Sequence, residues 1–115
     1  MKLYYGPQLL IDAKSPKFSR SQIKQILSEL CDEVKMHSIS EVETVKGADY
    51  NPGISGNVFI EFSNICIHTF DREDYAGFNL CLFSCKNFSV SKVIRYLKKK
   101  GVYDIDARRV WREIK

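Results

Sequence analysis

Two stretches of helical periodicity, separated by a long series of strand-like runs, constrain the fold of this 115-residue chain more than any other feature of its sequence. Apolar residues recur at intervals of three and four positions over about 21–35, which predicts an amphipathic helix with one buried face. Ser19 and Gln22 have the spacing of a capping box at its start. A second stretch with the same periodicity predicts a helix over about 90–100, with Gly101 ending it.

Runs of alternating residues, rich in β-branched and aromatic side chains, surround the two expected helices. They predict strands at 8–12, 38–45, 57–63, 65–70, 75–84 and 105–114. The Gly-x-Ser-Gly segment at 53–56 and the charged segment at 71–74 are expected to be breaks between strands. This order of elements predicts an α+β fold, a two-layer α/β sandwich with a mainly antiparallel sheet and both helices packed on one face. A chain of this length closes one core, so residues 1–115 are expected to form a single domain.

The composition, 44% hydrophobic and 28% charged with a net charge of +4, excludes a disordered or collagen-like chain. No apolar run approaches the ~20 residues of a membrane helix, and the amino-terminal segment lacks the pattern of a secretory signal. We therefore expect a cytoplasmic protein with no membrane partner, whose four cysteines are free thiols. No cysteine pair has the two-residue spacing of a zinc knuckle, and His37 and His68 lie far apart, so no metal site is expected.

Positive charge is concentrated in residues 92–115, which contain nine Lys or Arg and three acidic residues. This asymmetry is compatible with a nucleic-acid surface. The run 98–100, however, falls at the expected end of a helix, where cations interact favourably with the helix dipole. No Gly-Phe-Gly-Phe-type strand motif, GXXG loop or zinc finger accompanies the charge. We therefore expect no nucleic-acid partner, and a basic nucleic-acid-binding module ranks below the hypotheses given at the end of this section.

The most informative stretch runs from Tyr50 to Cys85. It contains, in order, Gly53-Ile54-Ser55-Gly56, Ser63 after an apolar strand, Ile67-His68-Thr69, and Leu82-Phe83-Ser84-Cys85. Together these motifs resemble the short prokaryotic class of pyruvoyl-dependent S-adenosylmethionine decarboxylases. The resemblance covers almost the whole chain in length and in the order of its elements, and the spacing of the two serines and the His-Thr pair makes it specific.

The resemblance implies a cofactor made from the protein's own backbone. A decarboxylase needs an electron sink for the carbanion left by CO2, and a ketone that forms a Schiff base with the substrate amine supplies one. In the family, a serine matched here by Ser63 attacks the preceding carbonyl, here that of Phe62, and the resulting ester undergoes β-elimination and hydrolysis to a pyruvoyl group. The chain is then expected to split between Phe62 and Ser63 into a β chain, 1–62, and an α chain, 63–115, that share one core.

The resemblance also assigns roles to three other residues. Ser55 is expected to hydrogen-bond and relay protons during the acyl shift, and His68 to remove the α-proton for the elimination. Cys85 corresponds to the thiol that returns a proton to the product carbon. Taken singly, Ser55 suits a tight turn, His68 a hydrogen-bonded strand position and Cys85 core packing, as expected for Cys66 and Cys81. Their joint spacing favours the catalytic interpretation, and strand alternation places Cys66 and His68 on one face.

Three departures from the family pattern fall on the expected processing and substrate segments. Phe62 stands where the family commonly has Glu, which bears on strain and solvation at the scissile bond. The segment after His68 is longer, so the acid that holds the substrate ribose has two candidates, Glu73 first and Asp71 second. The aromatic-x-Pro motif before the Gly-x-Ser-Gly segment, here Tyr50-Asn51-Pro52, lies one residue closer to it than in the family. Tyr50 is expected to stack on adenine, and its alternative role is that of an ordinary aromatic residue beside a turn.

The leading hypothesis is a cytoplasmic decarboxylase that acts on S-adenosylmethionine and supplies polyamine synthesis. An arginine or ornithine decarboxylase on the same scaffold is the runner-up, because the acidic segment 71–74 would suit a cationic side chain. The alternative from another class is an unprocessed, non-catalytic homologue that binds a metabolite or a partner. The resemblance further implies a homodimer of processed protomers and allows an active site at their interface.

Overall fold

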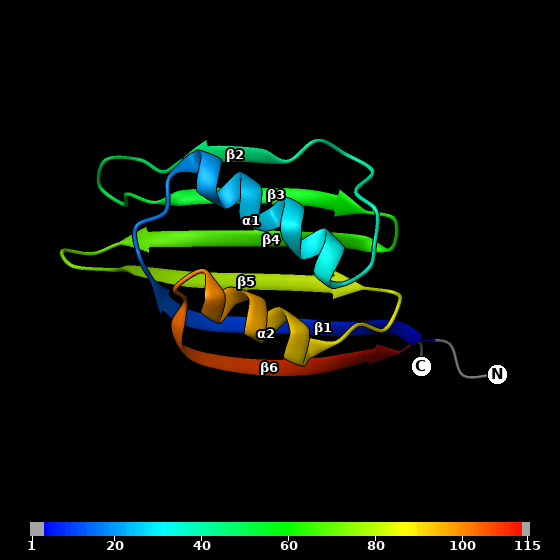
Figure 1. Cartoon of the computed structure of the whole chain (residues 1–115). Helices are drawn as coiled ribbons and strands as arrows, with labels where there is room; N and C mark the ends of the chain where they lie inside the picture. Colours follow the sequence, from blue (N-terminus) through cyan, green and yellow to red (C-terminus); the bar gives the residue numbers. More distant parts are fainter. Residues whose placement is uncertain (1–3, 114–115) are drawn as a thin grey trace.

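The computed structural model of this chain describes residues 4–113, which form one sheet of six strands and two helices (Figure 1). The elements are, in chain order, β1 Tyr4–Ser15, α1 Arg20–Glu33, β2 Glu43–Lys46, β3 Ile54–Ile60, β4 Ser63–Asp71, β5 Ala76–Ser84, α2 Val90–Lys99 and β6 Tyr103–Glu113. The strand order is β2-β3-β4-β5-β1-β6, and every neighbouring pair is antiparallel. Both helices cover the same face of the sheet (Figure 1). The predicted α+β sandwich is confirmed.

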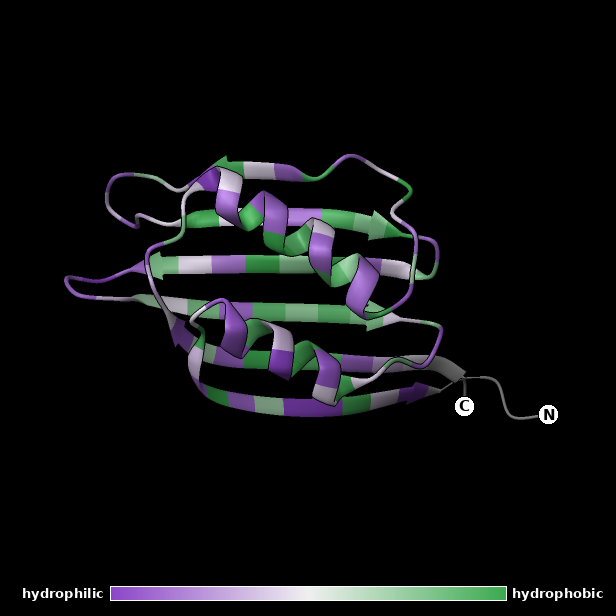
Figure 2. Cartoon of the chain, viewed as in Figure 1, coloured by the Kyte–Doolittle hydropathy of each residue, from purple (hydrophilic) through white to green (hydrophobic). Residues whose placement is uncertain are grey.

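Capping and apolar periodicity define the two helices. At the start of α1, the Gln22 backbone N–H donates to Ser19 Oγ at 3.2 Å, and the Ser19 N–H donates to Gln22 Oε1 at 2.8 Å. Ser89 caps α2, whose last helical residue, Lys99, lies two positions before Gly101. Figure 2 shows hydrophobic and hydrophilic residues alternating along both helices, as expected for elements with one buried face.

The two faces of the sheet differ in burial. The side chains beneath the helices are mostly apolar, and Ile65, Ile67, Leu80 and Leu82 on β4 and β5 are each 2% exposed or less. The opposite face carries the alternate residues, including Ser55, Asn57 and Phe59 on β3, Asn64, Cys66 and His68 on β4, and Asn79, Cys81 and Phe83 on β5. We call it the open face, because neither helix covers it (Figure 1). Several of its apolar side chains remain exposed, among them Val45, Phe59 and Val110.

The prediction of a break at 53–56 is wrong, because β3 begins at Ile54 and includes Ser55 and Gly56. Gly56 is required by the close approach of α1 rather than by a turn. A Cβ at this position would lie 2.7 Å from Leu27 Cδ1 and 2.9 Å from Ile23 Cγ2. The glycine therefore marks the place where the helix packs directly on the strand.

Other strand boundaries also differ from the prediction. The strand expected at 38–45 is reduced to β2 at 43–46, and Ser38 forms only an isolated bridge to Ile60. The first strand is longer than expected, because β1 pairs with both β5 and β6. The expected last strand reached position 114, which lies outside the described residues.

Three further observations concern the chemistry available to the described residues. Neither helix is long and apolar enough to cross a membrane. The four cysteines carry free thiols. Within residues 4–113, no group of three or more His, Cys, Asp or Glu side chains is arranged to hold a metal ion.

Candidate active site

A hydrogen-bonded cluster of Ser55, His68 and Cys66 lies on the open face. The register of β3 and β4 places Ser55 directly opposite His68, and Ser55 Oγ lies 2.7 Å from His68 Nδ1. Cys66, two residues earlier on β4, has its Sγ 3.3 Å from His68 Nε2. Both ring nitrogens of His68 therefore have a hydrogen-bond partner. The cluster lines a cavity of about 140 Å³ together with Glu43, Val45, Gly56 and Asn57.

Buried contacts hold the two strands together beside this cluster. The Ile54 N–H donates to Thr69 Oγ1 at 2.9 Å, and Thr69 follows His68 on β4. Gly53 lies so close to β4 that a Cβ there would overlap the Thr69 carbonyl oxygen. Burial raises the pKa of the Cys66 thiol, and the neighbouring Cys81 thiol adds to the rise. Cys66 is therefore a neutral thiol at neutral pH.

The Phe62-Ser63 bond lies at the other end of β4, in the turn between β3 and β4. Ile60 pairs with Ser63, so Glu61 and Phe62 make the turn. The Cys85 backbone N–H donates to the Phe62 carbonyl oxygen at 3.0 Å. Ser63 has a φ of +158°, which is uncommon for residues other than glycine. An attack of Ser63 on this carbonyl would therefore find a hydrogen-bond donor already placed for the developing oxyanion.

Neighbouring contacts fix the turn in place. The Glu61 carboxylate accepts from the His37 N–H at 3.0 Å, and the Glu61 N–H donates to the His37 carbonyl oxygen at the same distance. This backbone donor, followed by the charge of His37, lowers the pKa of the Glu61 carboxyl. Ser63 Oγ is 3.5 Å from Asn64 Oδ1, a long contact that leaves the hydroxyl free to turn.

The expected catalytic residues thus fall into two separate groups. The Phe62-Ser63 bond lies with the Cys85 N–H at the β3–β4 turn. Ser55 and His68 meet near the opposite end of the same two strands. Ser63 and His68 are five positions apart on β4, a distance of roughly 16 Å at about 3.3 Å per residue. A general base must lie within hydrogen-bond reach of the proton that it removes. Within one chain, His68 does not reach Ser63.

The expected substrate-binding residues lie at the end of the sheet that carries His68. Tyr50 is 94% exposed in the connection between β2 and β3. Asp71 ends β4, and its N–H donates to the Pro52 carbonyl oxygen at 2.8 Å, which ties the two neighbouring connections together. Glu73 lies in the connection between β4 and β5, where its carbonyl oxygen accepts from Lys17 Nζ at 2.9 Å. Figure 1 shows both connections at the opposite end of the sheet from the β3–β4 turn.

Sequence reasoning missed two contributors to these groups. It assigned Cys66 to core packing, although the alternation that places Cys66 and His68 on one strand face was a sufficient signal. It also did not identify the Cys85 backbone N–H as the partner of the Phe62 carbonyl. That contact depends on how the end of β5 lies beside the turn, and no local sequence pattern encodes it.

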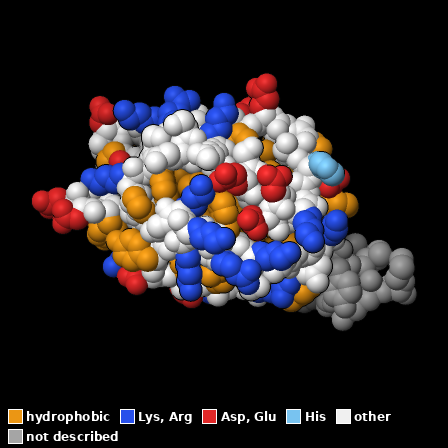
Figure 3. Space-filling model, in the orientation of Figure 1, with side chains coloured by type: hydrophobic (Ala, Val, Ile, Leu, Met, Phe, Trp, Pro, Cys, Tyr) orange, Lys and Arg blue, Asp and Glu red, His pale blue; other side chains and the backbone are white. Residues whose placement is uncertain are grey.

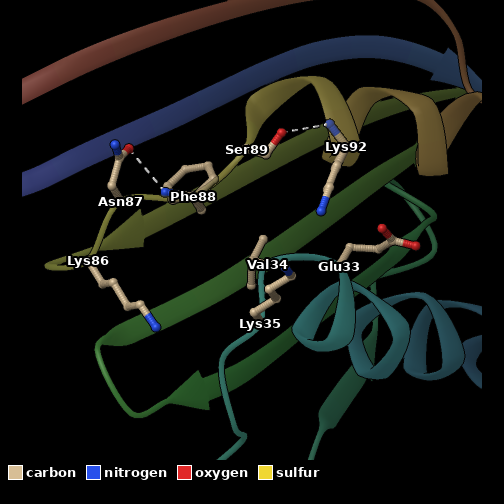
Figure 4. A pocket seen from close by; sticks show the side chains of 8 residues that line it. All are labelled: Glu33, Val34, Lys35, Lys86, Asn87, Phe88, Ser89 and Lys92. Carbon is tan, nitrogen blue, oxygen red and sulfur yellow. Dashed lines mark hydrogen bonds between the residues drawn. The ribbon is translucent and has the colours of Figure 1, made fainter.

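A second pocket of about 230 Å³ lies between the end of α1 and the start of α2 (Figure 4). It is lined by Glu33, Val34, Lys35, Lys86, Asn87, Phe88, Ser89 and Lys92. Lys86 Nζ is 5.6 Å from the centre of the Phe62 ring, so the pocket borders the β3–β4 turn. Figure 3 shows the Lys and Arg side chains gathered over α2, on the helix-covered side. The basic carboxyl-terminal segment therefore lies mostly away from the Ser55–His68 cluster.

Comparison with known proteins gives the same family from sequence and the same fold from structure. The profile of the S-adenosylmethionine decarboxylase family matches residues 10–113. Proteins named S-adenosylmethionine decarboxylase proenzyme from the Hall and Langeland strains of Clostridium botulinum are each 26% identical to this chain over 102 residues, covering 87% of this chain and 86% of theirs. A crystal structure of the adenosylmethionine decarboxylase from Aquifex aeolicus superposes with a TM-score of 0.69 at 21% identity, covering 98% of this chain and 94% of that one. Because the family profile matches most of the length of this chain, the chain belongs to the S-adenosylmethionine decarboxylase family.

Proposed function

We propose that this chain is a proenzyme that cleaves itself between Phe62 and Ser63 and becomes a pyruvoyl-dependent decarboxylase of S-adenosylmethionine. In this proposal it acts in the cytoplasm and supplies polyamine synthesis. One observation carries the self-cleavage: the Cys85 N–H donates to the carbonyl of Phe62, which is the group that Ser63 must attack. The same turn places the Ser63 hydroxyl on the residue that follows this carbonyl.

The first step is an acyl shift within the turn. Ser63 Oγ attacks the Phe62 carbonyl carbon, its proton passes to the Ser63 nitrogen, and the C–N bond breaks as an ester C–O bond forms. The Cys85 N–H stabilises the negative charge on the carbonyl oxygen during this step. The side chain of residue 62, where the family prefers Glu, takes no part in this step. The reacting groups are the backbone carbonyl of Phe62 and the side-chain hydroxyl of Ser63.

The second step needs a base. Removal of the Cα proton of residue 63 expels the Phe62 carboxylate and leaves a double bond between Cα and Cβ of residue 63. Addition of water and loss of ammonia then give the pyruvoyl group at the start of the 63–115 piece. We assign the base to His68, with Ser55 as its hydrogen-bond partner at 2.7 Å.

The turn at Phe62-Ser63 suits a pyruvoyl group, because the Cys85 N–H there is a hydrogen-bond donor to the Phe62 carbonyl. When formed, the group supplies an electron sink for the electron pair released with CO2. We assign the return of a proton to the product carbon to the Cys85 thiol, which is exposed. We assign substrate contacts to Tyr50, for adenine, and to Glu73 or Asp71, for the ribose.

The separation of Ser63 from His68 leads us to propose that a second copy of the chain supplies the base. In a symmetric dimer both copies use the same surface. By alternation the Ser63 side chain stands on the helix-covered face, so only its backbone is open to a partner on the open face. If two open faces pack together, a two-fold axis crossing β4 near Cys66 places the Ser63 backbone, with the Cα proton to be removed, opposite His68 of the other copy. Sheets packed face to face lie about 10 Å apart, a gap that side chains from both fill. Val45, Phe59 and Val110, which are 65%, 54% and 44% exposed, would become buried.

Intact-mass measurement of the purified protein tests the self-cleavage. We expect two pieces, 1–62 and 63–115, the second lighter by one ammonia than the serine-started peptide. Ser63→Ala should remain a single chain. Cleavage that persists in Ser63→Ala contradicts the proposed chemistry, and an unmodified parent chain after prolonged incubation favours the non-catalytic binding protein.

CO2 release from S-adenosylmethionine, arginine and ornithine then tests the substrate. We expect release from S-adenosylmethionine only, with Ser63→Ala as the inactive control. Release from arginine or ornithine instead would transfer the proposal to a basic amino acid, for which the carboxylates of Asp71, Glu73 and Asp74 offer the complementary charge.

A further inference from the structure

We propose that Cys66 is a positioning residue that holds the imidazole of His68 in the orientation needed for proton transfer. The catalytic meaning of this inference rests on the proposed function, in which His68 is the base. The hydrogen-bonded contact itself does not, since it is defined by the 3.3 Å separation of Cys66 Sγ from His68 Nε2.

The position of Cys66 follows from the sheet. Cys66 and His68 are two residues apart on β4, so both side chains stand on the open face. Cys66 lies on the central part of the strand, between Asn57 on β3 and Cys81 on β5. Its half-buried side chain is held by neighbours on both sides, whereas the ring of His68 is exposed. A fixed thiol is therefore placed to anchor a ring that would otherwise turn freely.

Hydrogen bonds to both ring nitrogens restrain the imidazole of His68 more than a single bond does. Ser55 bonds Nδ1 at 2.7 Å and leaves the other side of the ring unsupported. A neutral imidazole has one N–H donor and one acceptor nitrogen, so partners on both nitrogens fix the ring flip and favour one tautomer. Because burial keeps Cys66 a neutral thiol, it orients the ring without adding the negative charge that a carboxylate would bring.

Charged groups near the ring come from the neighbouring strands. On β2, Glu43 lines the same cavity as His68. On β5, Asn79 pairs with His68 and donates to Asp12 Oδ1 on β1 at 2.6 Å. The Asn79 side chain therefore lies between the Asp12 carboxylate and His68. The Cys81 thiol lies across from Cys66. Neither carboxylate has a hydrogen bond to His68 within the described residues, which leaves Cys66 and Ser55 as its direct partners.

Replacement of Cys66 tests the inference, with Cys81 as the matched control. Cys66→Ala removes the anchor, Cys66→Ser restores a hydrogen-bonding group, and Cys81→Ala removes a thiol from the same face without touching His68. We expect the elimination step to slow roughly tenfold in Cys66→Ala and its pH profile to change, because a misplaced base loses its alignment. Cys66→Ser and Cys81→Ala should stay close to the parent. Loss of activity that Ser does not restore, or an equal loss in Cys81→Ala, overturns the inference.

Nitrogen-15 NMR of the imidazole gives a readout that does not need activity. The chain has two histidines, so a His37→Gln background leaves His68 as the single signal. We expect well-separated Nδ1 and Nε2 resonances of one tautomer in the parent and in Cys66→Ser, and resonances shifted toward each other in Cys66→Ala. Unchanged resonances in Cys66→Ala contradict the positioning role. Failure of the parent to cleave itself would instead contradict the proposed function, while the NMR comparison still decides the role of Cys66.

Discussion

In the proposed self-cleavage, the Phe62-Ser63 bond depends on backbone groups more than on the side chain of residue 62. The Phe62 carbonyl is held by the Cys85 N–H, and the Glu61 carboxylate and N–H fasten the turn to His37. The Phe62 ring is 38% exposed and contacts Lys86 from outside the turn. These contacts indicate that the proposed self-cleavage tolerates different side chains at position 62.

We therefore predict that Phe62→Ala still cleaves itself. The nucleophile, the carbonyl and its N–H donor all remain, so the rate should fall by no more than about tenfold, equivalent to ~1.4 kcal/mol in the barrier. Intact mass against incubation time measures this, with Ser63→Ala as the uncleaved reference. A Phe62→Ala chain that stays intact would show that the aromatic ring itself shapes the scissile bond.

Gly56 tests the packing of α1 on β3. A Cβ there would lie 2.7 Å from Leu27 Cδ1 and 2.9 Å from Ile23 Cγ2, so Gly56→Ala forces both side chains to shift. We predict a loss of about 1–3 kcal/mol in the free energy of unfolding, the usual result of overpacking. Gly77→Ala is the matched control, because the nearest atoms to its Cβ are 3.6 Å or more away. Urea denaturation of the two variants should separate them, and equal midpoints would refute the packing argument.

At the scale of elements, one polar cluster joins the two helices. Tyr96 on α2 donates its hydroxyl to Glu29 Oε1 on α1 at 2.5 Å, and Lys100 Nζ lies 3.0 Å from the same oxygen. The hydrogen bond from Tyr96, followed by that from Lys100, lowers the pKa of the Glu29 carboxyl. Burial, followed by the bond to Glu29, raises the pKa of the Tyr96 hydroxyl. Both directions favour the neutral phenol bound to the carboxylate.

We predict that Tyr96→Phe lowers the free energy of unfolding by about 1 kcal/mol at pH 7. Because the pKa of Glu29 is lowered on folding, its contribution is present above the unfolded value near 4.5 and is lost as the pH falls through the folded value. The difference between Tyr96→Phe and the parent should therefore shrink at pH 3. Tyr103→Phe is the control, since no hydrogen bond of this hydroxyl is found among the described residues. A pH-independent difference would indicate lost packing instead of a lost bond.

Elements with strong local signals could be predicted from sequence, and those set by pairing could not. The apolar periodicity from Ile23 to Cys31 and the Ser19 cap sufficed for α1. By contrast, β2 is a short edge strand whose extent depends on its partner β3, and Gly56 sits inside a strand only because α1 lies above it. Long-range contacts determine the extent of β2 and the position of Gly56, and these contacts cannot be inferred from residues close in sequence.

At the scale of the whole molecule, the arrangement of the candidate site also depends on contacts that the local sequence does not encode. The spacing of Ser55, Ser63, His68 and Cys85 predicted one catalytic group, and these residues do belong to the matched family region. An extended strand, however, places Ser63 and His68 roughly 16 Å apart. The residue types could be proposed because their motifs resemble those of the family. Their division into two groups follows from strand geometry, and in the proposed dimer a second copy of the chain brings the groups together.

Mixing two inactive variants tests this arrangement. Ser63→Ala keeps the base and lacks the nucleophile, and His68→Ala has the opposite defect. We predict that neither variant cleaves itself alone. His68→Ala should stop at the ester, which has the same mass as the intact chain and is detected by its cleavage with hydroxylamine. In a mixed dimer, Ser63 of the His68→Ala chain meets His68 of the Ser63→Ala chain. Random pairing should then give pyruvoyl-blocked cleavage of about half of the His68→Ala chains.

A matched control separates complementation from simple stabilisation of the His68→Ala chain. The double variant Ser63→Ala/His68→Ala offers the same folded partner without any base, so it should restore no cleavage. Mass spectrometry of co-expressed chains carrying different tags measures the product from each. Restoration by the single variant but not by the double variant supports a base acting between copies. If co-expression with the single variant restores nothing, His68 does not act across the open faces, and the proposed dimer is wrong.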